Sequence, residues 1–216
     1  MYLLRDGFHT YLAKIKDHFL HSLRKIIKKH KYYLMVKRLS PANTYISDQT
    51  NTIELNQTVR HNDKILGYKT KDILALVRMG DKCFIHLSGV SIVGLSMGHI
   101  GRCYIRGPGI YIDISDEDVY IYWITVDSNI RRSGISTKMY NYYSEYYSSI
   151  GKKNLVYLVD CNNKIMLDNV NKSGFEIIEK IITYKIFDSI IIKLIKSKSI
   201  DLNCYFATKY RDVHTI

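Results

Sequence analysis

Hydrophobic and polar positions follow two different periodicities along the 216-residue chain. Near the start, apolar side chains recur every three or four residues, which is the spacing of one face of an α-helix. Most of the lysines and arginines between them fall on the other faces. The pattern predicts a basic amphipathic helix over residues 8–30. Its apolar positions are Phe8, Leu12, Ile15, Phe19, Leu23 and Ile26.

Short apolar runs separated by turn residues dominate the rest of the chain, and they are typical of β-strands. A first strand is expected at residues 32–39. The polar stretch 40–70 predicts short helices and loops, and a short helix is expected at 73–79. The later strands are expected at residues 83–87, 90–97, 102–106, 110–114, 119–126, 154–159, 175–187 and 189–195.

Two predicted helices between the later strands decide the fold class. The first, at residues 133–149, follows the run 119–126, which is apolar throughout, as in a strand covered on both faces. The second is expected at 165–172. Alternating strands and helices in this order predict parallel strands joined by buried, right-handed crossovers. We therefore expect an α/β protein, and its predicted parts are an N-terminal helix (1–31), a main domain (32–197) and a C-terminal tail (198–216).

The formal net charge of +12 is concentrated near the N-terminus. Residues 1–38 contain ten lysines and arginines against only Asp6 and Asp17. The predicted helix has three interpretations. Its apolar stripe packs on the domain or on a second copy of the chain, as in a homodimer; it lies on an anionic membrane surface; or it contacts nucleic acid. Nucleic acid is the weakest of these, because the basic surplus does not extend into the domain.

Cysteine spacing and the absence of long apolar segments argue against a zinc-binding, a redox-active or a membrane-spanning protein. No two of the four cysteines are closer than twenty residues, which offers neither a zinc site nor a Cys-x-x-Cys redox pair. No apolar run approaches the roughly 20 residues needed to span a bilayer, and no signal-peptide pattern is present. We therefore expect a cytoplasmic protein with reduced thiols and no metal centre.

The junction between the run 119–126 and the long helix carries the clearest chemistry. It is short, contains Arg131 and Arg132, and has small residues around Gly134, so that main chain can approach a ligand closely. The first N–H groups of a helix have no partner within the helix, and its dipole favours an anion there. The junction predicts a phosphate-binding turn. An ordinary strand-to-helix turn with two solvated arginines has the same local pattern.

At these residues the sequence resembles the GNAT superfamily of N-acetyltransferases. The family's Arg/Gln-x-x-Gly-x-Gly/Ala signature is matched by Arg131, Gly134 and Ser136, with serine in the last small position. A second family element, an asparagine eleven residues before a Gly-Phe pair, is matched by Asn163 and residues 174–175. Two motifs in the right order and at the right separation make the resemblance much stronger than either motif alone.

This resemblance implies a mixed central sheet of about six or seven strands with flanking helices, in which two parallel strands splay apart to leave an acyl-CoA cleft. The splay is expected at Val126 and Val159. The implied co-substrate is acetyl-CoA or a longer acyl-CoA, whose thioester is attacked directly by the primary amine of an acceptor, without a metal. The residues implied to bind it are Ile124, Thr125, Val126, Arg131, Arg132, Ser133, Gly134, Ile135, Ser136, Thr137 and Asn163.

The chain departs from the family where many members carry acid–base groups. Val170 stands where they have a tyrosine, and residues 119–126 contain no carboxylate. Asp160, after the next predicted strand, is the best-placed acid, although a cap or turn role is the stronger interpretation. Tyr122 is a further catalytic candidate that a core position would explain equally well. His99 falls at the end of a predicted strand, where a structural role is more frequent.

Three functions remain open from the sequence. The leading one is an N-acetyltransferase with an unidentified amine acceptor. The departures from the family pattern favour a catalytically degenerate module that binds CoA without turnover. The basic helix at 8–30 favours an acyltransferase at an anionic membrane surface, with a lipid-linked or envelope-precursor acceptor.

Overall fold

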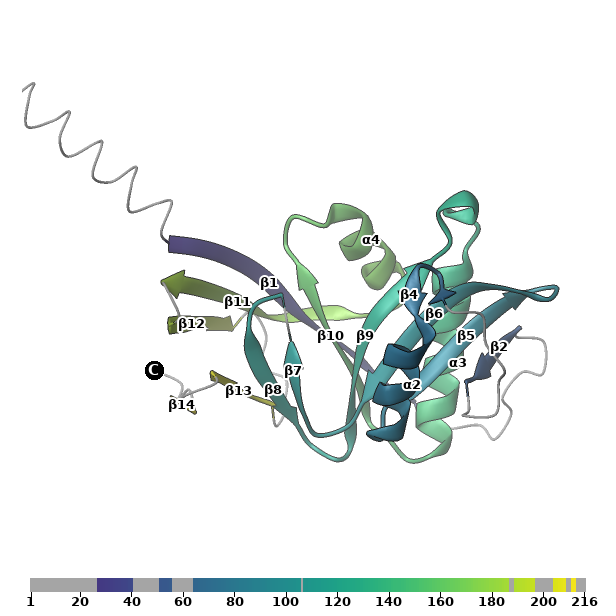
Figure 1. Ribbon diagram of the computed structural model, residues 1–216. Helices are drawn as coiled ribbons and strands as arrows, with labels where there is room; N and C mark the ends of the chain where they lie inside the picture. Colours follow the sequence, from purple (N-terminus) through teal and green to yellow (C-terminus); the bar gives the residue numbers. More distant parts are fainter. Residues whose placement is uncertain are drawn as a thin grey trace, which may run out of the picture.

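An eight-stranded mixed sheet forms the centre of the protein (Figure 1). The structure is a computed structural model, and it describes residues 27–40, 51–55, 64–105, 107–186, 189–196, 204–208 and 211–212. The strands of this sheet are β1 (Ile27–Arg38), β2 (Thr52–Glu54), β5 (Lys82–Ser88), β6 (Ser91–His99), β9 (Asp118–Val126), β10 (Asn154–Asp160), β11 (Glu176–Ile186) and β12 (Ser189–Lys196). Their order across the sheet is β12-β11-β1-β10-β9-β6-β5-β2.

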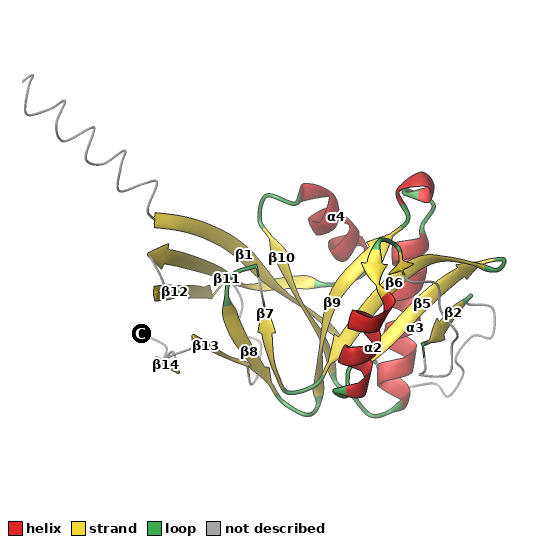
Figure 2. Cartoon of the chain, viewed as in Figure 1, coloured by secondary structure: helices red, strands yellow, loops and turns green. Residues whose placement is uncertain are grey.

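Two smaller sheets, three α-helices and a short 3-10 helix at Ser128–Ile130 complete the regular structure of the described residues (Figure 2). The four-stranded sheet has the order β14-β13-β8-β7, and a separate hairpin joins β3 to β4. Helix α2 packs on one face of the large sheet, whereas α3 and α4 pack on the other. None of these helices is long and apolar enough to cross a lipid bilayer. The bounds are β3 (Lys64–Ile65), β4 (Tyr68–Lys69), β7 (Arg102–Ile105), β8 (Ile110–Ile114), β13 (Cys204–Thr208), β14 (Arg211–Asp212), α2 (Thr70–Arg78), α3 (Ile135–Ser149) and α4 (Lys164–Lys172).

The first strand differs most from the sequence-based expectation. β1 begins at Ile27, so residues 27–30, expected in the N-terminal helix, lie in the sheet instead. The remainder of that predicted helix lies outside the described residues. The cause is tertiary: β1 lies between β10 and β11 and pairs with both in antiparallel fashion, and residues 27–31 pair with residues 182–186 of β11. These partners are distant in sequence, so the hydrophobic periodicity of residues 27–30 cannot reveal the pairing.

Two other segments are also more extended than expected. The described residues within 40–69 lie in strands and turns rather than in short helices. In the predicted C-terminal tail, β13 pairs antiparallel with β8, from Cys204↔Ile114 to Ala207↔Tyr111. Both segments are short and have no clear hydrophobic period, so only the partner strand determines their structure.

β9 and β10 are adjacent parallel strands that separate part-way along their length. Their pairing runs only from Asn154↔Asp118 to Tyr157↔Ile121. Beyond it β9 continues beside β6 and β10 continues beside β1, and the two ribbons diverge (Figure 1). Residues 118–121 are buried, whereas residues 122–126 are only partly buried. The predicted splay is confirmed, and it begins earlier in both strands than we expected.

Tyrosines fill much of the core between α3 and the sheet. The ring of Phe84 in β5 lies 5.0–5.9 Å, between centroids, from four tyrosine rings of α3. Side chains at every fourth position, Met139, Tyr143 and Tyr147, are fully buried. This packing fixes the axis of α3 against the sheet, and therefore the place where the helix begins. The four tyrosines around Phe84 are Tyr142, Tyr143, Tyr146 and Tyr147.

Candidate functional site

The second half of β9 contains a β-bulge. Leu95 of β6 pairs with Thr125 and Met97 pairs with Tyr122, so the single residue between them in β6 faces two residues of β9. One of these two, Trp123, has a φ of 56°. For a residue with a side chain this left-handed conformation costs about 1–2 kcal/mol. Such outliers persist only where the surrounding structure holds them, and bulges are frequent beside active sites.

The turn that follows β9 has the properties expected of an anion site. The Asp127 side chain accepts a hydrogen bond from the Asn129 N–H at 2.9 Å and so shapes a short 3-10 helix over Ser128–Ile130. Gly134 is the N-cap of α3, with a φ of 79°, and no side chain caps the helix. Because the first amides of a helix have no partner within it, the N–H groups at the start of α3 are available to a ligand.

The charge and space around this turn also suit a phosphate group. Residues 131–134 are exposed, including both arginines. A Cβ placed on Gly134 would meet no atom within 4 Å. The Ser133 hydroxyl donates to the Ile130 carbonyl at 2.6 Å and so helps to fix the turn. Uncapped amides, two exposed guanidinium groups and an open surface are the features that bind phosphate groups at the start of a helix.

Among the other residues predicted to bind CoA, Ile124 and Val126 pack toward the α3 core. Thr125 points to the other face, where its hydroxyl oxygen lies 3.3 Å from that of Tyr68. At the start of α3, Ile135 is buried and anchors the helix, whereas Ser136 is partly buried and Thr137 is exposed. The structure therefore brings residues 124–126 and 131–137 together at one end of β9.

Asn163 and Asp160 both have structural partners. The Asn163 side-chain oxygen caps α4 by accepting a hydrogen bond from the Met166 N–H at 3.2 Å. The Asp160 carboxylate accepts one from the Asn162 N–H at 2.8 Å, in the turn after β10. This is the turn role that was the stronger interpretation of Asp160. Participation of either residue in CoA binding or catalysis stays a prediction.

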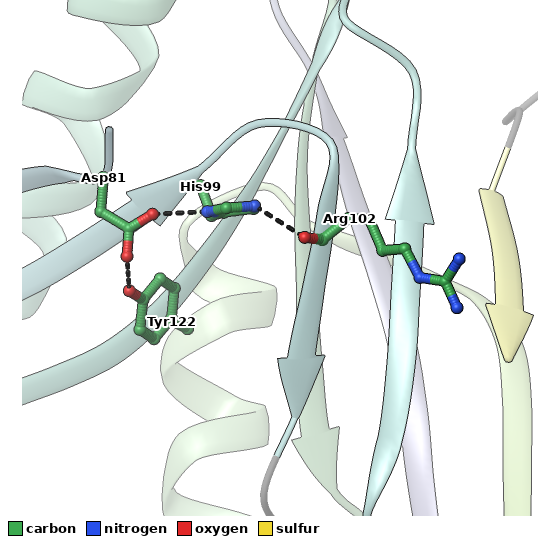
Figure 3. A network of polar contacts seen from close by, with 4 residues as sticks. All are labelled: Asp81, His99, Arg102 and Tyr122. Carbon is green, nitrogen blue, oxygen red and sulfur yellow. Dashed lines mark hydrogen bonds and ion pairs between the residues drawn. The ribbon is translucent and has the colours of Figure 1, made fainter. Parts of the chain in front are cut away.

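Tyr122 belongs to a polar network that the sequence analysis missed (Figure 3). Its hydroxyl donates a hydrogen bond to one carboxylate oxygen of Asp81, in the turn between α2 and β5, and the other oxygen contacts Nδ1 of His99. Nε2 of His99 lies 3.1 Å from the carbonyl oxygen of Arg102. The Asp81 side chain is 6% exposed. The three side chains come from separate elements, so no local spacing in the sequence connects them.

The electrostatics of the network limit what Tyr122 can do. Burial, and then the hydrogen bond to Asp81, raise the pKa of Tyr122 well above its usual value. The phenol is neutral near pH 7 and its proton is held by a carboxylate, so it is a poor acid for a departing thiolate. Val170 is fully buried and provides no acid either. Among the described residues, no three His, Cys, Asp or Glu side chains are grouped so that they could hold a metal.

Comparison with known proteins reveals similarity at the level of structure. No family model and no curated protein matches the sequence. A GNAT-family acetyltransferase from Colwellia psychrerythraea matches with a TM-score of 0.50 and 12% identity, over 74% of this chain and 57% of that one. This chain has the GNAT fold. A GCN5-related N-acetyltransferase from Sphaerobacter thermophilus gives a TM-score of 0.49 and 11% identity, over 85% of this chain and 58% of that one.

At 12% identity the likeness to the Colwellia protein concerns the GNAT fold alone. The chain spans little more than half the length of either protein. The expected fold class is therefore confirmed. The signature residues Arg131, Gly134 and Ser136 lie where a strand that leaves its parallel partner turns into a helix.

Proposed function

We propose that this protein transfers an acetyl or longer acyl group from acyl-CoA to a primary amine. The observation that carries the proposal is the turn at residues 131–136. There, α3 begins at Gly134 without a side-chain cap, beside two exposed arginines and at the end of the splayed strand β9. The GNAT fold supports the same function, because the signature residues Arg131, Gly134 and Ser136 lie at the turn after the splayed strand β9.

In the proposed complex, the chain's own main-chain groups bind most of the acyl-CoA. The N–H groups of residues 132–137 would hold the pyrophosphate, and Arg131 and Arg132 would add positive charge. The edge of residues 124–126 that faces away from β6 would pair with the pantetheine arm as an added strand does. Asn163 uses its side-chain oxygen to cap α4, which leaves its NH₂ group to donate to the pantetheine.

The chemistry that this arrangement supports is direct attack by a neutral amine on the thioester carbon. A C–N bond forms as the C–S bond breaks, and the CoA thiolate leaves and takes up the proton that the amine releases. A main-chain N–H of β9 would stabilise the negative charge that develops on the carbonyl oxygen. Alignment of the two reactants supplies much of the rest of the acceleration.

A dedicated proton donor is not essential to this mechanism, because a thiol with a pKa of about 8.5 leaves readily as thiolate. The buried Val170 and the engaged hydroxyl of Tyr122 nevertheless favour a second candidate, a CoA-binding module without turnover. The two candidates differ in one measurement. A transferase consumes acetyl-CoA when it is offered a panel of primary amines, whereas the module binds CoA and consumes none.

The phosphate-binding turn is tested by two variants at one position. Asparagine adopts the left-handed conformation of Gly134 more readily than most residues, so Gly134→Asn measures the cost of a side chain alone. Gly134→Asp has almost the same shape but adds a negative charge. We expect Gly134→Asn to bind CoA within a few-fold of the unchanged protein, and Gly134→Asp to bind it at least about tenfold more weakly by calorimetry.

Both variants should lose a few degrees of thermal unfolding midpoint to the same extent, because a side chain at Gly134 meets no atom within 4 Å but must adopt a φ of 79°. Equal dissociation constants for the asparagine and aspartate variants would contradict the assignment of this turn as the diphosphate site.

A further inference from the structure

Several contacts on the α2 face hold the bulge of β9. The Tyr122 hydroxyl donates to Asp81. The Trp123 ring meets the Tyr68 ring edge to face, with centroids 4.4 Å apart, and the Tyr68 hydroxyl oxygen lies 3.3 Å from that of Thr125. The left-handed backbone at Trp123 is intrinsically unfavourable, and these side-chain contacts are placed to stabilise it.

The protonation state of His99 decides how many of its two ring contacts can be hydrogen bonds. One ring nitrogen faces a carboxylate oxygen of Asp81 and the other faces the backbone carbonyl of Arg102. A carbonyl only accepts hydrogen bonds, and so does an ionised carboxylate. A neutral imidazole has one N–H, so it can satisfy only one of these two acceptors. Both contacts are hydrogen bonds only when His99 is an imidazolium.

We propose that Asp81 and His99 are positioning residues for β9. Protonated His99 fixes the Asp81 carboxylate, Asp81 fixes the Tyr122 hydroxyl, and Tyr122 holds the adjacent bulge at Trp123. The bulge lies on the stretch of β9 whose main-chain N–H would polarise the thioester. This last step rests on the proposed function, whereas the conformational link does not.

His99 is the member of this set whose charge changes near neutral pH. The buried thiols on neighbouring strands, Cys83 and Cys103, stay neutral because burial raises the pKa of each to about 12. Tyr122 stays neutral for the reason given above. The guanidinium of Arg102 lies 4.9 Å from the centroid of the Tyr111 ring. Within the described part of the chain, the charged group that contacts His99 is the carboxylate of Asp81.

The hydrogen bond to Asp81 raises the pKa of His99 above 6.5 in the folded protein. A raised pKa means that the folded state binds the proton more tightly than the unfolded state. The stabilisation is therefore complete below pH 6.5, and it is lost as the pH rises through the folded-state value. The contacts that connect His99 through Asp81 and Tyr122 to the bulge at Trp123 should weaken over the same pH interval.

Fluorescence measures this link directly, because Trp123 is the only tryptophan in the chain. We expect selectively excited tryptophan emission to change with pH in one transition whose midpoint lies above pH 6.5. His99→Gln should abolish that transition, because glutamine carries no charge and does not titrate. The matched control His30→Gln replaces a histidine on β1 whose ring stacks on Tyr32, and it should leave the transition in place.

A second variant keeps the inference testable if His99→Gln fails to fold. Tyr122→Phe retains the ring and removes the hydroxyl, so at low pH its emission should already resemble that of the unchanged protein at high pH. Emission identical to that of the unchanged protein at every pH would overturn the inference. A transition that survives in a folded His99→Gln variant would overturn it too.

Kinetics separate this inference from the proposed function. With an amine substrate that the protein acetylates, His99→Gln and Asp81→Asn should lower kcat by about tenfold, because a small displacement of the polarising N–H is costly. The dissociation constant of CoA should change little, since the phosphate turn is untouched. If the unchanged protein binds no CoA, the proposed function fails while the fluorescence link can still hold. If it transfers acyl groups and both variants match its kcat, the positioning role fails alone.

Discussion

Tyr147 carries its hydroxyl into the core between α3 and β6, where that oxygen has no hydrogen-bond partner among the described residues. A buried hydroxyl without a partner loses its hydration and gains nothing in return. We therefore expect Tyr147→Phe to leave the free energy of unfolding unchanged or to raise it by about 1 kcal/mol in urea denaturation. Tyr140 is the control, because its equally buried hydroxyl donates to the Met166 sulfur at 3.8 Å. A loss from Tyr147→Phe as large as that from Tyr140→Phe would show that the hydroxyl has a partner.

Single residues could be predicted from the sequence where their partners are neighbours in the chain. Arg131 and Gly134 belong to one turn, so their spacing alone located the candidate phosphate site. The contacts of Asp81 with His99 and Tyr122 span 18 and 41 positions. Only the folded sheet brings these groups together, and His99 by itself was indistinguishable from a structural histidine. The left-handed backbone at Trp123 could not be predicted from the sequence either, because tryptophan does not favour that conformation.

At the scale of elements, α3 packs against β6 because alternate residues of the strand and every fourth residue of the helix have nearly the same spacing. Alternate residues of a strand are about 6.6 Å apart, and every fourth residue of a helix is about 6 Å along its axis. Small residues at 94, 96 and 98 of β6 therefore lie under the large side chains at 139, 143 and 147 of α3. A Cβ on Gly98 would lie 2.1 Å from the Tyr147 hydroxyl oxygen, and one on Gly94 would lie 2.7 Å from the Met139 sulfur.

This packing predicts that Gly98→Ala lowers the free energy of unfolding by about 1–3 kcal/mol, because the fully buried Tyr147 ring has no room to move. Gly94→Ala should cost less, since the methionine side chain is flexible. Adding Tyr147→Phe to Gly98→Ala should recover part of the loss, and a double-mutant cycle of urea unfolding measures the coupling. Strictly additive effects would mean that α3 does not approach β6 through Gly98.

The elements themselves were largely predictable, because apolar runs and turn residues lie next to one another in sequence. The run 110–114 coincides with β8, and most other described strands and helices differ from expectation by only a few residues at either end. β2, β3, β4, β13 and β14 were not foreseen. Each is five residues or shorter and becomes a strand only through its partner.

At the scale of the whole molecule, β1, the first described strand, lies inside the sheet, third from one edge. β1 lies between β10 and β11. Helix α4 connects these two strands in sequence, so the connection from β10 to β11 passes across β1. Periodicity can indicate that a segment is a strand but not where in a sheet it lies. The position of β1 was therefore beyond prediction from the sequence, and with it the boundary that we expected after residue 31.

Two shortened chains test this position. A chain that begins at residue 27 keeps all of β1, whereas a chain that begins at residue 32 loses the five residues that pair with 182–186 of β11. The shorter chain also loses Lys29, whose ammonium lies 5.3 Å from the centroid of the Tyr184 ring. Because each backbone hydrogen bond contributes about 1 kcal/mol, the chain starting at 32 should be less stable by a few kcal/mol. Urea unfolding of the two shortened chains measures this difference. Equal stability of the two shortened chains would place residues 27–31 outside the sheet, and the N-terminal helix would then be free to extend to residue 30 as its periodicity suggests.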